Sequence, residues 1–125
     1  MKKEIKILLK AIIFHNNKIL IMKRSNKESL SGYWDFPGGN LDFLESKEKS
    51  IQREIYEETG LMVKDIPQFF DEELIYKRNK KHYLLFLFKA NVNHNKIRLS
   101  SEHDDFKWIK KSDLSKIKLN PILKF

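Results

Sequence analysis

The most informative stretch of the chain is residues 39–61, which read GNLDFLESKEKSIQREIYEETGL. Its second half predicts a helix over residues 46–59. Ser46 is a residue type that caps helix N-termini, and Gly60 suits the position just after a helix. Ile51 and Ile55 form an apolar pair one turn apart, so we expect this face of the helix to pack on a sheet.

The same helix carries three carboxylates on one face. Glu54, Glu57 and Glu58 stand at i, i+3 and i+4, and a like-charged pair at this spacing costs about 0.2–0.5 kcal/mol. Arg53 relieves only part of that repulsion. A hard cation such as Mg²⁺ or Mn²⁺, which prefers oxygen ligands, would stabilise the arrangement. The alternative is an ordinary exposed helix rich in glutamate.

The charge distribution sets this stretch apart from the remainder of the chain. The 125 residues carry 25 basic and 17 acidic side chains, a formal charge of +8. Residues 39–61 contain six acids and three bases, or −3, which leaves +11 elsewhere. This contrast predicts a cation site inside a field that attracts anions. Nucleic-acid binding would favour a positive charge on residues 39–61, so no stable nucleic-acid partner is expected. The lysines scattered along the rest of the chain are also typical of a solvated surface.

The flanking sequence predicts several strands around one strong helix. Apolar and β-branched runs predict strands, and polar or glycine-rich runs predict turns. The expected strands are residues 5–14, 19–23, 34–36, 69–77, 82–89 and 106–109. The expected turns are residues 15–18, 37–39 and 78–81, a further turn is expected to open at residues 120–121, and a short helix is expected to begin at residues 112–114. This pattern indicates a mixed sheet covered by helices.

Length and composition restrict the remaining possibilities. A chain of 125 residues suits one domain, residues 1–125. The absence of cysteine excludes disulfides, thiolate metal sites and cysteine nucleophiles. No apolar run approaches the ~20 residues that span a bilayer, and the N-terminus does not read as a signal peptide. We therefore expect a cytoplasmic protein with no membrane partner. The sequence does not indicate whether the protein is a monomer or a homodimer.

The spacing within residues 39–61 resembles the signature of the Nudix hydrolases, G-x5-E-x7-R-E-U-x-E-E-x-G-U, where U is a large apolar residue. Each fixed position is filled, by Gly39, Glu45, Arg53, Glu54, Ile55, Glu57, Glu58, Gly60 and Leu61. The approach Trp34-Asp35-Phe36-Pro37-Gly38-Gly39 and the pattern of Glu102 followed by residues 106–109 are similar to MutT-type members.

The resemblance implies an α/β/α sandwich with a mixed β-sheet, in which residues 39–61 form a loop–helix–loop. It also implies hydrolysis of a nucleoside diphosphate linked to another group, with Mg²⁺ or Mn²⁺. Glu57 and Glu58 would be metal ligands, helped by the Gly38 carbonyl, and Glu54 a further ligand or the general base. Arg53 and Glu45 would hold the loop and helix together. Glu102 would be a further acid, ligand or base, against the equal alternative of a surface glutamate.

Within this family the sequence favours a MutT-like nucleoside triphosphate pyrophosphohydrolase, acting on normal or oxidised nucleotides to give a monophosphate and pyrophosphate. Lys23 and Arg24 are candidates for phosphate contacts, and the alternative is a solvated strand end. Gly39 would allow close approach of the substrate. Phe36 would contact a base or lie in the core, and Asn120 would read a purine edge or simply open a turn.

Other functions stay open. Hydrolysis of dinucleoside polyphosphates would agree with Tyr76, fifteen residues beyond Leu61, whereas no proline lies near that distance, the feature that would favour ADP-ribose. A non-catalytic nucleotide- or RNA-binding module is supported only by the net charge. His15, His82, His94 and His103 are dispersed and are expected to be surface or packing residues.

Overall fold

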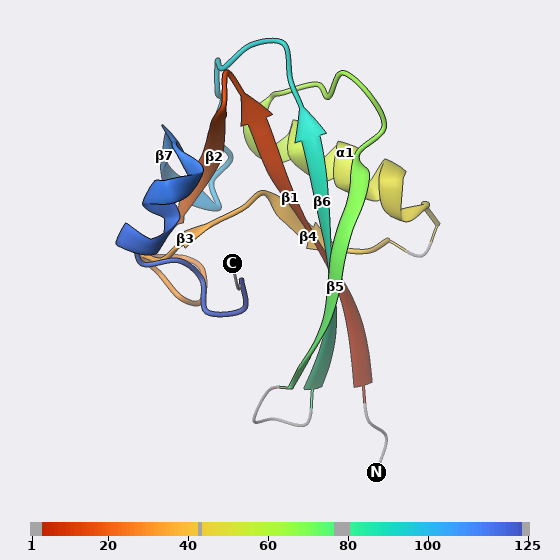
Figure 1. Ribbon diagram of the computed structural model, residues 1–125. Coiled ribbons are helices and arrows are strands. Elements are labelled where there is room, and N and C mark those ends of the chain that lie inside the picture. The colour runs from red at the N-terminus through yellow and green to blue at the C-terminus, as the bar shows by residue number, and fades with distance from the viewer. Residues whose placement is uncertain (1–3, 43, 77–80, 124–125) are drawn as a thin grey trace.

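The computed structural model describes residues 4–42, 44–76 and 81–123. Within these residues seven strands form one sheet with two helices beside it (Figure 1). The strands are β1 (Glu4–His15), β2 (Lys18–Arg24), β3 (Trp34–Asp35), β4 (Gly38–Asn40), β5 (Gln68–Tyr76), β6 (Lys81–Asn91) and β7 (His103–Ile109). The helices are α1 (Lys47–Thr59) and the 3₁₀ helix η1 (Lys111–Lys116).

The sheet is mixed, as expected. Its main order is β3-β2-β1-β6-β5, with β4 paired to β1 and β7 paired to β2. The central strand β1 is parallel to β6 and antiparallel to both β2 and β4. The predicted hairpin of β1 and β2 is present, and β7 begins three residues earlier than expected because it pairs along β2.

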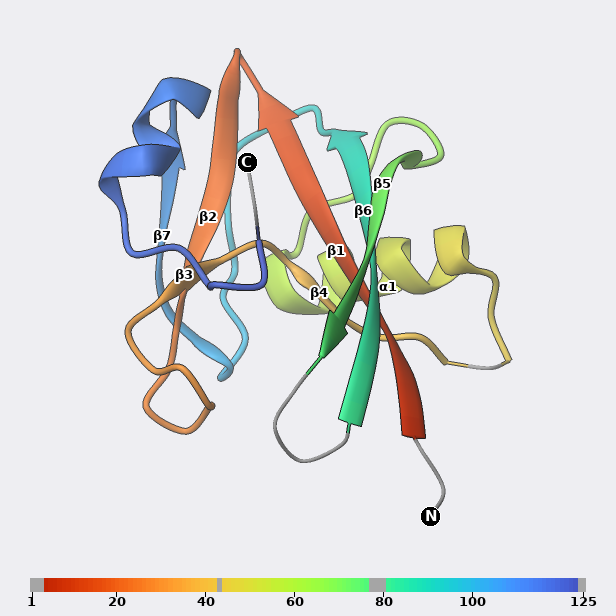
Figure 2. The same cartoon turned by 60° about the horizontal axis from the view of Figure 1, so that its bottom comes forward.

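Strands β1 and β2 diverge from their turn, and the chain from β3 to β4 crosses the space between them (Figure 2). The predicted tight turn at residues 37–39 is therefore wrong, because Gly38 and Gly39 belong to β4 and pair with Lys10 and Leu9. Only a residue without a side chain fits at Gly38. A Cβ atom there would overlap the carbonyl oxygen of Leu9.

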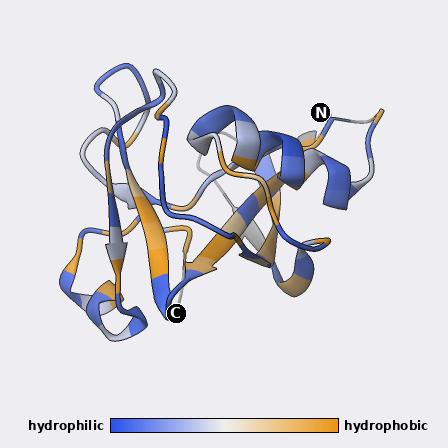
Figure 3. Ribbon diagram, turned by 90° about the horizontal axis from the view of Figure 1, so that it is seen from above, coloured by the Kyte–Doolittle hydropathy of each residue, from blue (hydrophilic) through white to orange (hydrophobic). Residues whose placement is uncertain are grey.

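Helical segments cover both faces of the sheet. On one face α1 buries Ile51 and Ile55 completely, as the apolar pair predicted. On the other face η1 and the chain after it bury Leu114 and Leu123. The second face of the sheet is thus covered by the 3₁₀ helix η1 and by the non-helical chain that follows it. In Figure 3 the long strands carry the hydrophobic stretches, whereas α1 is mostly hydrophilic.

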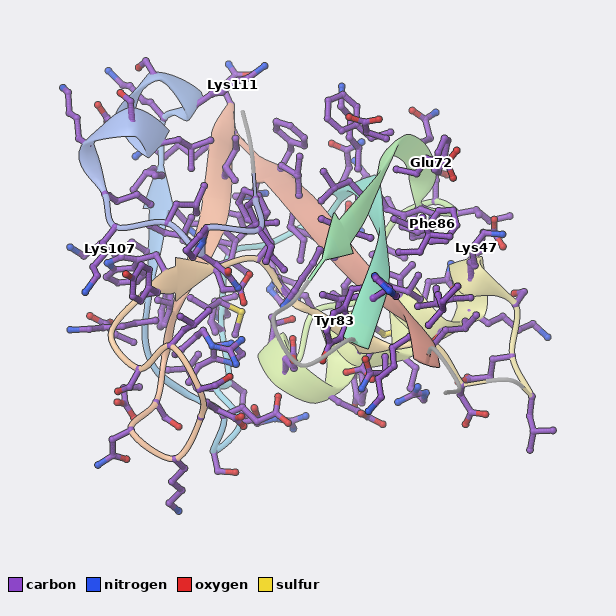
Figure 4. The ribbon with its side chains drawn as sticks, turned by 90° about the horizontal axis from the view of Figure 1, so that it is seen from below. Lys47, Glu72, Tyr83, Phe86, Lys107 and Lys111 are labelled. Carbon is purple, nitrogen blue, oxygen red and sulfur yellow. The ribbon has the colours of Figure 1, made fainter. Side chains whose placement is uncertain are left out.

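Both predicted ends of α1 are confirmed. The Ser46 side chain accepts a hydrogen bond from the Lys49 N–H, and Gly60 ends the helix with a φ of 75°. At the start of α1 the Lys47 ammonium lies 5.1 Å from the centroid of the Phe86 ring, and Figure 4 shows the two side by side. The expected turn at 120–121 is present. The expected turn at 78–81 falls mostly on residues 77–80, outside the described residues.

Neither helix in the described ranges has the length and apolar character that a bilayer crossing requires.

Candidate active site

Glu58 is the most deeply buried carboxylate of α1, with 4% of its surface exposed. Its Oε2 atom accepts a hydrogen bond of 2.9 Å from the Gly38 N–H on β4. Burial raises the pKa of Glu58 well above its ordinary value; the positive charge of Lys10 and the Gly38 hydrogen bond act in the opposite direction, and Glu102 raises it further. A carboxylate in this setting is stabilised in its charged form by a nearby cation.

Glu102 reaches the same place from the loop before β7. The loop is tied to the C-terminal end of α1 by main-chain hydrogen bonds, from Arg98 N–H to the Thr59 carbonyl (2.8 Å) and from Ser100 N–H to the Glu58 carbonyl (3.3 Å). The Ser25 N–H donates to the Glu102 carbonyl at 3.0 Å. These contacts fix where the Glu102 side chain begins.

Glu58, Glu102 and His103 form the acid cluster of this site. Each offers one ligand atom, and these atoms all lie within 4.8 Å of one another. Two carboxylates this close repel each other unless a proton or a cation lies between them. The two carboxylates suit a hard divalent cation such as Mg²⁺ or Mn²⁺ and so fit the metal that the sequence implied, whereas an imidazole nitrogen is more typical of sites for zinc or iron.

His103 was expected to be a surface or packing residue, and its place in the cluster was missed. It is 7% exposed, and the described part of the structure offers its Nδ1 atom no hydrogen-bond partner. Burial, followed by the charge of Lys10, lowers the pKa of His103. The neutral imidazole is the form that binds metals. The sequence feature that could have identified His103 as a site residue is its position directly after Glu102.

Glu54 lies against β4. A Cβ atom on Gly39 would be 2.8 Å from the Glu54 carboxyl, so the glycine makes room for this side chain. Burial raises the pKa of Glu54; Arg53 opposes this shift, and the charges of Glu57 and Glu102 add to it. Glu54 therefore interacts electrostatically with the acid cluster from the α1 side.

Arg53 links the loop to the helix, as the resemblance implied. Its Nε donates to Glu45 Oε1 at 2.8 Å, and its Nη1 lies 3.3 Å from Glu54 Oε1 and 3.2 Å from Glu57. These hydrogen bonds raise the pKa of Arg53 above its ordinary value, and the bond to Glu45 has the largest effect. The Glu57 side chain is 55% exposed and pairs with Arg53, so its role as a metal ligand stays a prediction. The same holds for the Gly38 carbonyl.

The acid cluster opens into a cavity of about 210 Å³, here called the acidic cavity. Its walls include the acid cluster, both glycines of β4, and the cations Lys10 and Arg24. Positive side chains and carboxylates therefore line the same cavity. A ligand that carries both a cation and anionic oxygens would satisfy both sides.

A second cavity of about 150 Å³ adjoins the first and is here called the apolar cavity. Leu8, Lys10 and Arg24 line both cavities. The apolar cavity is completed by Ser29, Leu30, Tyr83, Asn120 and Ile122. Tyr83 is labelled on β6 in Figure 4. Apolar side chains with one aromatic ring and one amide form a surface typical of ligand pockets.

Asp35 is completely buried and connects, by hydrogen bonds, residues that line the two cavities. Its Oδ2 atom accepts hydrogen bonds from Lys10 Nζ (3.0 Å), Arg24 Nη1 (2.9 Å) and Asn120 Nδ2 (3.1 Å). Burial alone would raise the pKa of Asp35, but the charge and hydrogen bond of Lys10, with hydrogen bonds from Asn120 and the Phe36 N–H, bring it below its ordinary value. Sequence analysis did not single out Lys10 or Asp35, although a lysine inside the apolar run of residues 5–14 was a visible signal.

The other predicted substrate residues lie in different settings. Phe36 is completely buried in the core with Ile21 and Leu87, in agreement with the alternative of a core aromatic. Lys23 is on β2 between Trp34 and Asp105 and outside both cavities. Asn120 is 3% exposed and lines the apolar cavity.

A larger cavity of about 660 Å³ lies at the C-terminal end of β1, around the turn at Asn16 and Asn17. Its described lining contains one carboxylate, Asp65, and asparagines. Since one acid gives no clustered donor set, the chemistry is assigned to the acidic cavity.

The geometry agrees with the comparisons to known proteins. A family model described as the NUDIX domain matches residues 10–124. A protein of Buchnera aphidicola named 8-oxo-dGTP diphosphatase is 34% identical over 104 residues, which cover 82% of this chain and 75% of that protein. A protein of the same name from Proteus vulgaris is 37% identical over 62 residues, 50% of this chain and about half (55%) of its own length. The crystal structure of the MutT protein from Methanosarcina mazei superposes with a TM-score of 0.83 at 25% identity, covering 97% of this chain and 88% of that one.

The chain therefore belongs to the Nudix family. Within the family it is a MutT-like hydrolase with the expected α/β fold, and the resemblance drawn from residues 39–61 is confirmed.

Proposed function

We propose that the protein hydrolyses a diphosphate linkage in nucleoside diphosphate derivatives with Mg²⁺ as its cofactor, and that Mn²⁺ can replace it. The favoured substrates are nucleoside triphosphates, normal or oxidised, which give a nucleoside monophosphate and pyrophosphate. The convergence of Glu58, Glu102 and His103 on one cavity, which Lys10 and Arg24 also line, carries this proposal.

Glu58 and Glu102 would hold the cation, with His103 and Glu54 beside them. A divalent cation in this position neutralises phosphate oxygens and polarises a water nucleophile. The Gly38 N–H holds the Glu58 carboxylate in one orientation, so little reorganisation is needed when substrate arrives.

Glu54 is the candidate general base, and Glu102 is the alternative. A base is most effective when its pKa lies close to the working pH, and burial raises the pKa of Glu54 in that direction. In either case the carboxylate accepts the proton of the attacking water. Since phosphoryl transfer depends mainly on positioning and charge stabilisation, no covalent nucleophile is required.

The central test compares turnover in Glu58→Gln and Glu57→Gln with a matched control on the same helix, Glu48→Gln, which lies in the first turn away from the cavity. Both test variants should lose about 10²-fold or more of kcat while circular dichroism stays unchanged, and the control should keep its turnover. Normal Mg²⁺-dependent turnover in both test variants would contradict the assignment.

The substrate is best identified by a panel. Comparison of kcat/KM for dGTP, oxidised dGTP, other nucleoside triphosphates, ADP-ribose and dinucleoside polyphosphates separates the alternatives, and ³¹P NMR of the products shows which bond breaks. Two relatives named 8-oxo-dGTP diphosphatase make oxidised dGTP the first compound to test. The RNA-binding alternative would give salt-dependent RNA binding without release of pyrophosphate or phosphate.

A further inference from the structure

Lys10 stands out among the cations of this region. It is in the middle of the central strand β1, only 5% of its surface is exposed, and it lines both cavities. A buried ammonium group is costly unless its charge is paired and its three N–H donors find acceptors. Within the described part of the chain, Lys10 Nζ donates one hydrogen bond, to Asp35 at 3.0 Å.

Arg24, the other cation shared by the two cavities, is occupied by the protein itself. Its Nε donates to the Ser29 carbonyl at 2.7 Å, and its Nη1 donates to Asp35 at 2.9 Å. Its Nη2 lies 3.4 Å from the Ser29 hydroxyl and 4.0 Å from Glu28. Most of the guanidinium donors therefore have acceptors, and Lys10 is the group that has donors left for a ligand.

The charges around Lys10 are mixed. Lys10 and Arg24 contribute two positive charges, while Asp35 and Glu28 contribute two negative charges, and Glu28 lies next to Arg24, not next to Lys10, in the ion pairs of this region. On the acidic side, Glu58, Glu102 and His103 face the same cavity. A cation bound to those carboxylates would offset their negative charge, so that an anionic oxygen could approach the remaining donors of Lys10.

The order of the two cavities decides which part of a nucleotide lies at Lys10. If the nucleoside occupies the apolar cavity and the departing pyrophosphate lies with the cation in the acidic cavity, then the phosphate attached to the nucleoside lies at their junction. Lys10 lines that junction. This reasoning rests on the proposed function, because it assumes that a nucleotide spans both cavities.

We propose that Lys10 Nζ binds an oxygen of the phosphate attached to the nucleoside, and that Asp35 holds the ammonium group at the junction of the two cavities. Lys10 is thus a substrate-binding residue, and Asp35 is a positioning residue that acts through it. The sequence predicted phosphate contacts from Lys23 and Arg24, and this proposal adds Lys10 of the central strand β1.

The first experiment measures binding of matched ligands to the whole protein with Mg²⁺ present. Lys10→Met keeps the length of the side chain and removes its charge, and Lys18→Met removes one lysine charge from the exposed start of β2 as the control. The probes are the four ribonucleoside monophosphates, their nucleosides, and inorganic pyrophosphate. Lys10→Met should weaken the tightest-bound monophosphate by about tenfold or more, change nucleoside binding by less than about twofold, and affect pyrophosphate less than the monophosphate. The control should bind as the wild type does.

Several results would overturn the proposal. These are unchanged monophosphate binding in Lys10→Met, equal weakening of nucleoside and monophosphate, or no monophosphate binding by the wild type. The binding arm does not depend on turnover, so the two proposals can fail separately. A wild type that hydrolyses nucleotides while Lys10→Met binds normally would leave the proposed function standing and remove this inference.

The second experiment tests the positioning role of Asp35. Asp35→Asn should weaken monophosphate binding in the wild-type background and weaken it at least about threefold less in the Lys10→Met background. Equal losses in both backgrounds would show that Asp35 does not act through Lys10. If Asp35→Asn fails to fold, Asp35→Glu takes its place in the same cycle, judged by the same criterion.

Discussion

The Gly38 N–H lies 2.9 Å from Oε2 of Glu58, although the two residues are 20 positions apart in the chain. This hydrogen bond joins the strand that fills the gap between β1 and β2 to the last turn of α1. It orients a carboxylate of the acid cluster by a main-chain donor. The geometry of the candidate site is therefore coupled directly to the path of β4.

The two glycines of β4 should respond differently to alanine. In Gly38→Ala the new Cβ would overlap the Leu9 carbonyl oxygen, which belongs to the rigid sheet, so a loss of about 4 kcal/mol or complete unfolding is expected. In Gly39→Ala the Cβ meets only the end of the Glu54 side chain, at 2.8 Å. That variant should keep its stability within about 1 kcal/mol and lose activity, because Glu54 must move. Urea unfolding and kcat measure the two effects, and equal stability losses would contradict the distinction.

The metal-free protein should become less stable as pH rises above the ordinary glutamate range. Burial raises the folded-state pKa of Glu58 and Glu54 above the ordinary value of a glutamate. Between the unfolded and folded pKa values, the folded state binds more protons than the unfolded state, so the free energy of unfolding falls as pH rises. Urea unfolding from about pH 5 to about pH 8 should show this slope, and Glu58→Gln should flatten it. A slope that Glu58→Gln leaves unchanged would exclude Glu58 as its source.

Glu102→Gln should stabilise the metal-free protein and weaken metal binding. The substitution removes one of two facing carboxylates, whose mutual repulsion raises the pKa of Glu58. We expect a higher unfolding free energy without metal at neutral pH, and a smaller stabilisation by Mn²⁺ than the ~2.7 kcal/mol that a ligand at 100 times its Kd provides. Thermal unfolding with and without Mn²⁺ measures both effects. An equal gain from Mn²⁺ in wild type and variant would place Glu102 outside the metal site.

Arg53→Lys should impair turnover more than stability. The guanidinium reaches Glu45 through Nε and both Glu54 and Glu57 through Nη1, and one ammonium group cannot span these three acceptors. Since the group is partly exposed, with 34% of its side-chain surface accessible, the loss of stability should stay near 1 kcal/mol. The loss in kcat should be about tenfold or more, because Glu54 is no longer fixed. Unchanged kcat in Arg53→Lys would show that the acids are positioned without this link.

The parts of the fold that the sequence predicted are those governed by local patterns. Ser46, the Ile51–Ile55 pair and Gly60 specify α1 and its packing within a single stretch. The strand β4 was missed because two glycines in succession are typical of turns, and only the neighbouring backbone of Leu9 shows why they are required in a strand.

The sequence named Arg24, Glu102 and Asn120 as single candidates outside residues 39–61, and all three line the cavities, but it did not predict which polar groups meet there. The Lys10–Asp35 contact joins positions 25 apart and the Asp35–Asn120 contact joins positions 85 apart. Hydrophobic periodicity indicates which positions are buried, but it does not indicate which buried polar groups meet. His103 was missed for the same reason, since its neighbour Glu58 lies on α1.

The loop before β7 is anchored to the end of α1 by hydrogen bonds of peptide groups, at Arg98 and Ser100, and the Arg98 guanidinium also lies 5.7 Å from the centroid of the Tyr56 ring. The amino acids of this loop can therefore change in evolution, provided that the number of residues between the end of α1 and Glu102 stays the same. Single-residue insertions or deletions there should be far more damaging than replacements, so a search for distant members with the same chemistry gains more from matching loop length than from matching loop composition.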